Sequence, residues 1–69
     1  MDPRHGTVYV DNAGCVYAVM GNSVYRARRA LPDKTGWHAV QGLPPRTTPE
    51  AAQEDLDNMA NARGWEKQP

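Results

Sequence analysis

The sequence predicts an α+β fold, an antiparallel β-meander of three to four strands with one C-terminal α-helix packed on one face. Two observations predict this class. Residues 7–30 alternate in side-chain character between turn-forming residues, as strands joined by hairpins do. Residues 48–64 carry a helix start, an apolar helical period and a helix stop. The 69 residues are expected to form one domain, 1–69, and a chain of this length buries only about 60% of its unfolded surface.

Strands are expected over about residues 7–10, 15–20, 23–30 and 37–43. Between the first two, residues 11–14 have turn composition, and a four-residue turn places Tyr9 on the same side as Val16. Between the second and third, Gly21-Asn22 suits the primed turn of a two-residue hairpin. That turn fixes the register, so that Ala18 pairs with Tyr25.

The fourth strand has two candidate phases. In one phase Trp37, Ala39 and Leu43 pack inward, and in the other His38 and Val40 do. The sequence leaves this choice open. The two prolines that follow Leu43 end the strand, because proline cannot donate to a ladder.

The helix is expected over about residues 49–63. Thr48 is a good N-cap, Pro49 suits the first helical position, and Glu50 complements the positive end of the helix dipole. Gly64 fits the left-handed position just past the helix, and Trp65 is expected to fold back toward the last turns of the helix. The apolar face carries the helically spaced residues Ala52, Leu56, Met59 and Ala60. Residues 66–69 are expected to be loose.

Side-chain alternation sorts the hairpin residues onto two faces. The face expected to meet the helix is nearly all apolar and carries Val16, Ala18, Met20, Tyr25 and Ala27. The opposite face mixes apolar, aromatic and cationic side chains, from Val8, Val10, Cys15, Tyr17, Val19, Val24, Arg26 and Arg28. One helix covers only one face of a sheet. The second face is therefore the expected interaction surface.

The charges are polarised along a chain whose formal net charge is zero. Residues 1–47 hold six cations and three anions, whereas residues 48–69 hold two cations and five anions. Zero net charge argues against a generic polyanion binder. Cys15 is the only cysteine, so no disulfide forms within the chain, and a lone thiol fits a reducing cytoplasm better than a secreted scaffold.

Catalysis, metals and cofactors are not expected. Cys15 and His38 are the only candidates for a nucleophile and its base, and a meander of this size offers no deep pocket for them. One cysteine and two histidines, His5 and His38, cannot complete a closed zinc site. The sequence has no apolar run near the length of a membrane span.

Two sets of residues are candidates for partner binding. The first set is Tyr17, Arg26, Arg28 and Arg29, because arginines beside aromatics are favoured at interface centres. The second set is Glu54 and Asp57, from an acidic stripe along the helix. A homodimer is a third hypothesis, with contacts through Cys15, Val19 and Val24 and with Cys15 able to link two chains if oxidised.

Three segments of the chain resemble the arm-type DNA-binding domain of tyrosine integrases and related AP2-like domains. They are Val24-Tyr25-Arg26-Ala27-Arg28, Gly36-Trp37-His38-Ala39-Val40 and Thr48-Pro49-Glu50-Ala51-Ala52-Gln53. The resemblance spans about forty residues of common elements. It implies a three-stranded sheet, backed by a helix, that lies in a DNA groove. A β-sheet DNA- or RNA-binding module of a mobile element is the alternative function.

In its size, polarised surface and lack of catalytic residues, the chain also resembles small phage and prophage proteins of anti-CRISPR type. This resemblance is one of type and not of motif, so it carries over no site residue. It implies a non-catalytic interaction protein that binds and blocks a host protein or nucleoprotein complex. That is the expected function.

Overall fold

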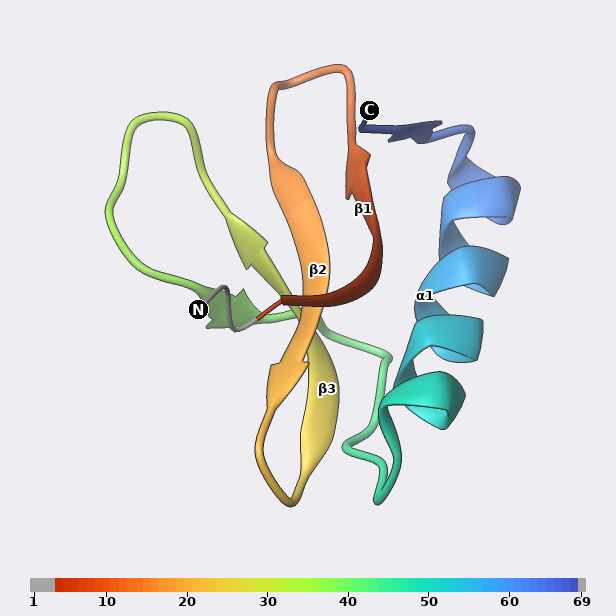
Figure 1. Cartoon of the computed structure of the whole chain (residues 1–69). Helices are drawn as coiled ribbons and strands as arrows, with labels where there is room; N and C mark the ends of the chain where they lie inside the picture. Colours follow the sequence, from red (N-terminus) through yellow and green to blue (C-terminus); the bar gives the residue numbers. More distant parts are fainter. Residues whose placement is uncertain (1–3, 69) are drawn as a thin grey trace.

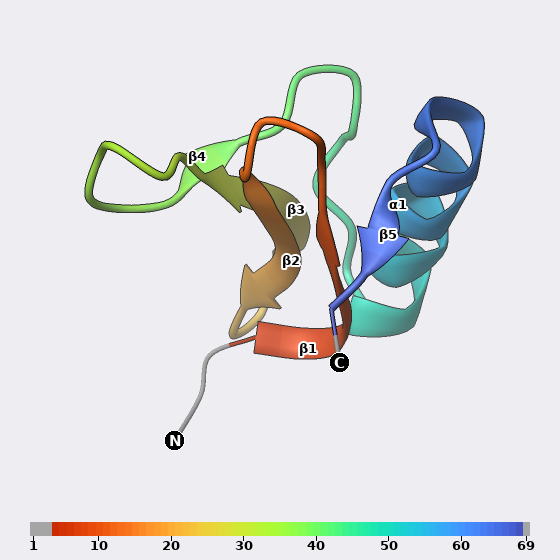
Figure 2. The ribbon, with the colours of Figure 1, turned by 90° about the horizontal axis from the view of Figure 1, so that it is seen from above.

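The computed structural model describes residues 4–68, with side chains from Gly6 onward, and confirms the α+β class. Its elements, in chain order, are β1 (Arg4–Val10), β2 (Val16–Gly21), β3 (Tyr25–Ala30), β4 (His38–Ala39), α1 (Pro49–Arg63) and β5 (Glu66–Lys67). They form an antiparallel sheet in the order β4-β3-β2-β1-β5, and α1 packs on one side of it (Figure 1, Figure 2). Residues 1–3 and 69 of the expected domain, and the side chain of His5, lie outside this description.

The connection between β1 and β2 is one residue longer than expected. Val10 pairs with Val16, so five residues, 11–15, form the turn. Asp11 Oδ1 accepts hydrogen bonds from the backbone N–H groups of Ala13 and Cys15, both at 2.9 Å. The Asp11 N–H in turn donates to the Cys15 carbonyl at 3.1 Å. A single aspartate therefore sets the length of this turn, as short polar side chains commonly do.

The connection between β2 and β3 is also one residue longer than expected. Gly21 pairs with Tyr25, which leaves a three-residue loop, 22–24. The prediction of a two-residue turn is therefore wrong. Gly21 has φ +147°, and an added Cβ would overlap the backbone of Val24. Gly21 is the last residue of β2, and glycine is the residue that adopts such a positive φ without a steric cost. Gly21 therefore lies at this connection, as expected, but it ends β2 and does not occupy the turn itself.

Because the connections before and after β2 are each one residue longer than expected, β2 turns toward the helix the face that was expected to point away from it. Tyr9 pairs with Tyr17, and Val19 pairs with Ala27, so these four side chains share the side covered by α1. Alternation places Val16, Ala18 and Met20 on the other side, although they were expected to meet the helix. A change of one residue in a connection inverts the strand that follows it.

The core lies between α1 and this side of the sheet. It contains Tyr9, Cys15, Tyr17, Val19, Ala27, Val40, Leu43, Ala52, Leu56 and Ala60, with Tyr25, Leu31, Met59 and Trp65 packed against it. Leu56 and Val19 are fully buried at its centre. The expected apolar face of the helix is therefore confirmed, with Met59 at its margin.

The helix runs over the residues that its signals predict. The Thr48 side chain accepts a hydrogen bond from the Ala51 N–H at 3.3 Å, which caps the first turn. After Arg63, Gly64 adopts the left-handed conformation, and the Trp65 N–H donates to the Ala60 carbonyl at 3.0 Å. This reversal brings the chain back to the sheet, where β5 pairs with the end of β1. The expectation that residues 66–69 are loose is therefore wrong for β5.

The fourth strand is shorter than expected, since β4 contains only His38 and Ala39. Both are exposed, whereas Val40 and Leu43 are buried, so neither of the two phases holds along the whole segment. The chain leaves the ladder after Ala39, and the Val40 N–H donates to the Ala27 carbonyl at 3.2 Å. A bridge between Tyr25 and Arg46 then covers the start of the same β3 edge.

We expect Gly21→Ala to destabilise the protein by roughly 2–4 kcal/mol, because alanine is strained at this positive φ and its Cβ overlaps the Val24 backbone. Urea unfolding followed by circular dichroism measures this change. Gly36→Ala is the matched control, since Gly36 has φ +90° but no atom within 4 Å of the added Cβ. Equal losses for the two variants would contradict the packing argument.

Candidate interaction site

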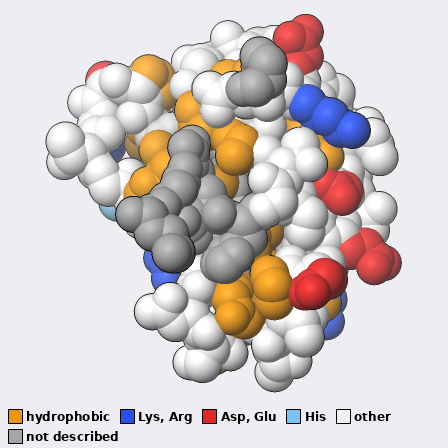
Figure 3. Space-filling model, in the orientation of Figure 1, with side chains coloured by type: hydrophobic (Ala, Val, Ile, Leu, Met, Phe, Trp, Pro, Cys, Tyr) orange, Lys and Arg blue, Asp and Glu red, His pale blue; other side chains and the backbone are white. Residues whose placement is uncertain are grey.

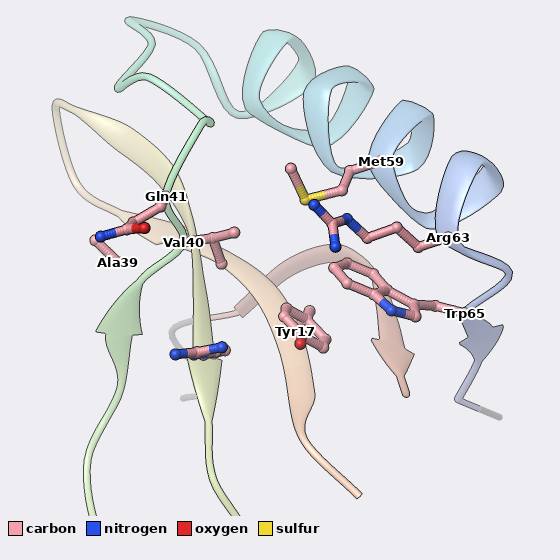
Figure 4. A pocket seen from close by; sticks show the side chains of 8 residues that line it. Tyr17, Ala39, Val40, Gln41, Met59, Arg63 and Trp65 are labelled. Carbon is pink, nitrogen blue, oxygen red and sulfur yellow. The ribbon is translucent and has the colours of Figure 1, made fainter. Parts of the chain in front are cut away.

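A hollow of about 340 Å³ lies between the β3–β4 side of the sheet and the last turns of α1 (Figure 4). Its lining includes Tyr17, Arg29, Val40, Met59, Arg63 and Trp65. Met59 and Arg63 extend from α1 toward Trp65, and Val40 points into the same space from the segment after β4. Residues far apart in the sequence are thus brought together by the packing of the helix on the sheet.

The floor of the hollow is an aromatic stack. The Tyr17 and Trp65 rings lie with centroids 3.9 Å apart and planes inclined by 14°. The Tyr17 hydroxyl donates to Asp11 Oδ2 at 2.8 Å. Burial and this hydrogen bond raise the pKa of Tyr17, while a side-chain hydrogen bond with Arg29 acts in the opposite direction. One side of the floor is therefore fixed by the core and the other by the β1–β2 turn.

Asp11 is the acidic group that anchors this floor. Burial acts to raise its pKa, but the hydrogen bonds from the Tyr17 hydroxyl and from the backbone of Cys15 and Ala13 outweigh burial, so the pKa of Asp11 is lowered. Its two oxygens accept three hydrogen bonds from these groups. The carboxylate is thus ionised at neutral pH and committed to the turn and to Tyr17.

The rim of the hollow is cationic. Arg29 projects from β3 and Arg63 from the last turn of α1, and both side chains are exposed. Among the residues described, no aspartate or glutamate lines the hollow. Two guanidinium groups above an aromatic floor make a site that attracts an anion and also offers apolar contact area.

The structure divides the first set of predicted partner-binding residues. Tyr17 and Arg29 meet at the hollow. Arg28 pairs with Ala18 and Ala39 on the other side of the sheet and is half-buried. Arg26 is also half-buried, and its Nη2 donates to the Leu43 carbonyl at 3.1 Å. The expectation that Tyr17 shares one open face with Arg26 and Arg28 is wrong, because β2 is inverted relative to β3.

The second set lies on α1, where acidic side chains gather along one side of the molecule (Figure 3). Glu54 is exposed. Asp57 is half-buried and accepts hydrogen bonds from the Tyr9 hydroxyl at 2.6 Å and from Gln53 Nε2 at 2.9 Å. Burial first, and then the bond to Asp57, raise the pKa of Tyr9 to about 12. Asp57 thus ties the helix to β1.

The residues expected at a dimer contact are separated in the structure. Cys15 and Val19 are buried in the core, with 6% and 0% of their surface exposed, whereas Val24 is 58% exposed in the β2–β3 loop. Burial, followed by the nearby charge of Asp11, raises the pKa of the Cys15 thiol. The premise that Cys15 is open to a second chain is therefore wrong, and its thiolate form is disfavoured.

Sequence reasoning missed Arg63 and Trp65 as site residues. Arg63 lies in the last helical turn, where a cation complements the negative end of the helix dipole, and Trp65 was expected only to fold back onto the helix. The signal that could have found them is the Gly64-Trp65 pair, because a left-handed glycine after a helix turns the next side chain back onto the last turns.

Comparison with protein families, characterised proteins and solved structures finds no match. The case for a site therefore rests on geometry. Among the side chains that the structure describes, from Gly6 to Gln68, no cluster of three or more His, Cys, Asp or Glu is placed to hold a metal ion. No helix in the same range is long and apolar enough to span a membrane.

The raised pKa of Tyr9 predicts a loss of stability at alkaline pH. The unfolded pKa is near 10 and the folded value is about 12, so the contribution of Tyr9 is complete below pH 10 and is lost as the pH rises through 12. We expect Tyr9→Phe to lower the free energy of unfolding by about 1–3 kcal/mol at pH 8, because it removes the hydrogen bond to Asp57. Urea titrations at pH 8–12 should show this difference shrinking above pH 10. A constant difference would contradict the assignment.

The lowered pKa of Asp11 predicts the opposite dependence. The contribution of Asp11 to stability is present above 3.8, the pKa of this group in the unfolded chain. It is lost as the pH falls through the lower pKa that Asp11 has in the folded protein. We expect Asp11→Asn to destabilise the protein by about 1–3 kcal/mol at pH 7 and by less at pH 2. Asp33→Asn, in the exposed β3–β4 loop, controls for the loss of a charge. An effect of Asp11→Asn that is equal at both pH values would disprove this role.

Proposed function

We propose that this protein is a non-catalytic interaction protein that binds a bacterial host protein or nucleoprotein complex and blocks it by occupying its surface. An anti-CRISPR-like inhibitor is the most concrete form of the proposal. The observation that carries it is the cationic hollow, where Arg29 and Arg63 flank the Tyr17–Trp65 stack. Arginine and tryptophan are the residue types that most often dominate binding energy at the centre of protein interfaces.

The rigidity of the hollow also supports this function. Tyr17 is 4% exposed, stacked on Trp65 and hydrogen-bonded to Asp11, so the floor is already ordered before a partner arrives. Less conformational entropy is then lost on association than in a flexible site. A preorganised floor suits a protein that acts by tight stoichiometric binding.

The edges of the sheet favour recognition through side chains. β4 and β5, the two outer strands, contain two residues each. Along β3, the Tyr25 N–H donates to the Arg46 carbonyl at 2.8 Å, and the Ala27 carbonyl accepts from Val40. Short, covered edges discourage the addition of a partner strand. The contact is therefore made through the hollow and its rim.

A DNA- or RNA-binding module is the second candidate, because arginines beside aromatics also suit phosphates and unstacked bases. The zero net charge of the chain disfavours it, because affinity for nucleic acid without sequence preference comes from a surplus of cations. The two candidates differ in their response to salt. A complex held by many phosphate contacts weakens steeply as salt rises.

Charge reversal at the rim tests the proposal. We expect Arg29→Glu and Arg63→Glu to weaken partner binding by at least about a hundredfold, because each replaces an attraction by a repulsion at the centre of the contact. Lys34→Glu, an exposed substitution in the β3–β4 loop with the same charge change, should leave binding intact.

The measurement is a tagged capture from nuclease-treated bacterial lysate, followed by reconstitution with the purified partner and an assay of that partner's activity. The proposal is supported if the wild type and Lys34→Glu capture and inhibit the same protein while the two arginine variants do neither. It is overturned if all variants behave alike, or if capture disappears on nuclease treatment and follows the steep salt dependence of phosphate binding.

A further inference from the structure

We infer that the hollow recognises the carboxylate of an acidic side chain on a partner protein, with an apolar neighbour of that residue packed against Trp65 and Met59. The inference rests on the proposed function and names the chemistry of the partner segment. It is carried by the charge, the shape and the aromatic floor of the hollow.

The charge of the hollow calls for an anion. Arg29 and Arg63 approach it from two different elements, and no acidic side chain among the described residues lines it. The nearest acidic group of the floor is Asp11, whose oxygens already accept from the Tyr17 hydroxyl and from two backbone N–H groups. Asp11 therefore holds the floor in place and is not among the residues that line the hollow.

The charges around the hollow favour a single carboxylate over a phosphate chain. A nucleic-acid backbone bears a charge at every nucleotide and is held by several cations along its path. The described lining of the hollow offers only two, Arg29 and Arg63. A carboxylate is one compact charge, and its planar shape matches the guanidinium fork in two parallel hydrogen bonds.

The size and the lining of the hollow leave room for an apolar neighbour. A volume of about 340 Å³ exceeds what one carboxylate fills and falls within the range of small-molecule pockets, about 300–1,000 Å³. Trp65 and Met59 are half-buried at its wall. A methionine adapts its shape to what it contacts, and a tryptophan gains from losing water on the rest of its surface.

Titration of the isotopically labelled protein with a short peptide tests the inference directly. The probe is an acetylated and amidated Ala-Glu-Leu-Glu-Ala peptide, and its control is the Ala-Gln-Leu-Gln-Ala peptide. Nuclear magnetic resonance should show shifts of the Trp65 indole N–H and of the Arg29 and Arg63 Nε–H signals. The indole of Trp37, which lies outside the hollow, should not move.

Lysine substitution separates fork recognition from simple attraction. Arg29→Lys and Arg63→Lys keep the charge but remove the fork, so we expect each to weaken binding of the Glu peptide by at least about fivefold. Lys34→Arg is the matched control and should not change the affinity. For residues outside the hollow, the spectra of the variants should match those of the wild type, which shows that the fold is kept.

Three results would overturn the inference: no shift with the Glu peptide, equal shifts with the Gln peptide, or tighter binding of a ten-nucleotide oligothymidylate to the same signals. Unchanged affinity in both lysine variants would overturn recognition by the fork. Failure here is distinguishable from failure of the proposed function, because the arginine-to-glutamate variants can lose partner capture even when this peptide does not bind.

Discussion

The burial of Tyr17 beneath the end of α1 is the contact on which the rest of the structure depends. Its ring stacks on Trp65 and thereby holds the chain that leaves the helix against the sheet. Its hydroxyl donates to Asp11, which also organises the β1–β2 turn. One residue thus links the helix end, the central strand and the first turn. The same contact creates the floor of the hollow, so fold and candidate site share one physical origin.

A second tie acts at the other side of the helix. Asp57 accepts hydrogen bonds from Tyr9 and Gln53, and the Gln53 side chain also donates to the Thr7 carbonyl at 3.2 Å. These polar contacts connect α1 to β1. In a domain of 69 residues the apolar core is small, and such bonds at its margin define how the helix sits. The position of the helix in turn sets where Arg63 lies at the hollow that Arg29 also lines.

The separation of charges favours a specific partner surface over polyanions in general. Cations from β3 and from the last helical turn gather around the hollow, while carboxylates occupy the side of α1. A protein with no net charge is not drawn to any polyanion without discrimination. It can still bind strongly where a partner places one acidic group and one apolar group in the right arrangement. Blocking a protein surface needs only that kind of local match.

The sequence by itself determined the class of the fold, the helix and its caps, and the location of the strands, because capping residues, apolar period and turn composition act over a few neighbours. It did not determine which face of β2 is buried. Connections of five and three residues, where four and two were expected, invert that strand and move Tyr17 and Val19 into the core. Tertiary packing decided those lengths, because burying two large side chains under the helix outweighs the preference of one turn type over another. The hollow follows from that choice, because only the inverted β2 brings Tyr17 beneath Trp65 and beside Arg29, and local sequence patterns cannot show such a contact.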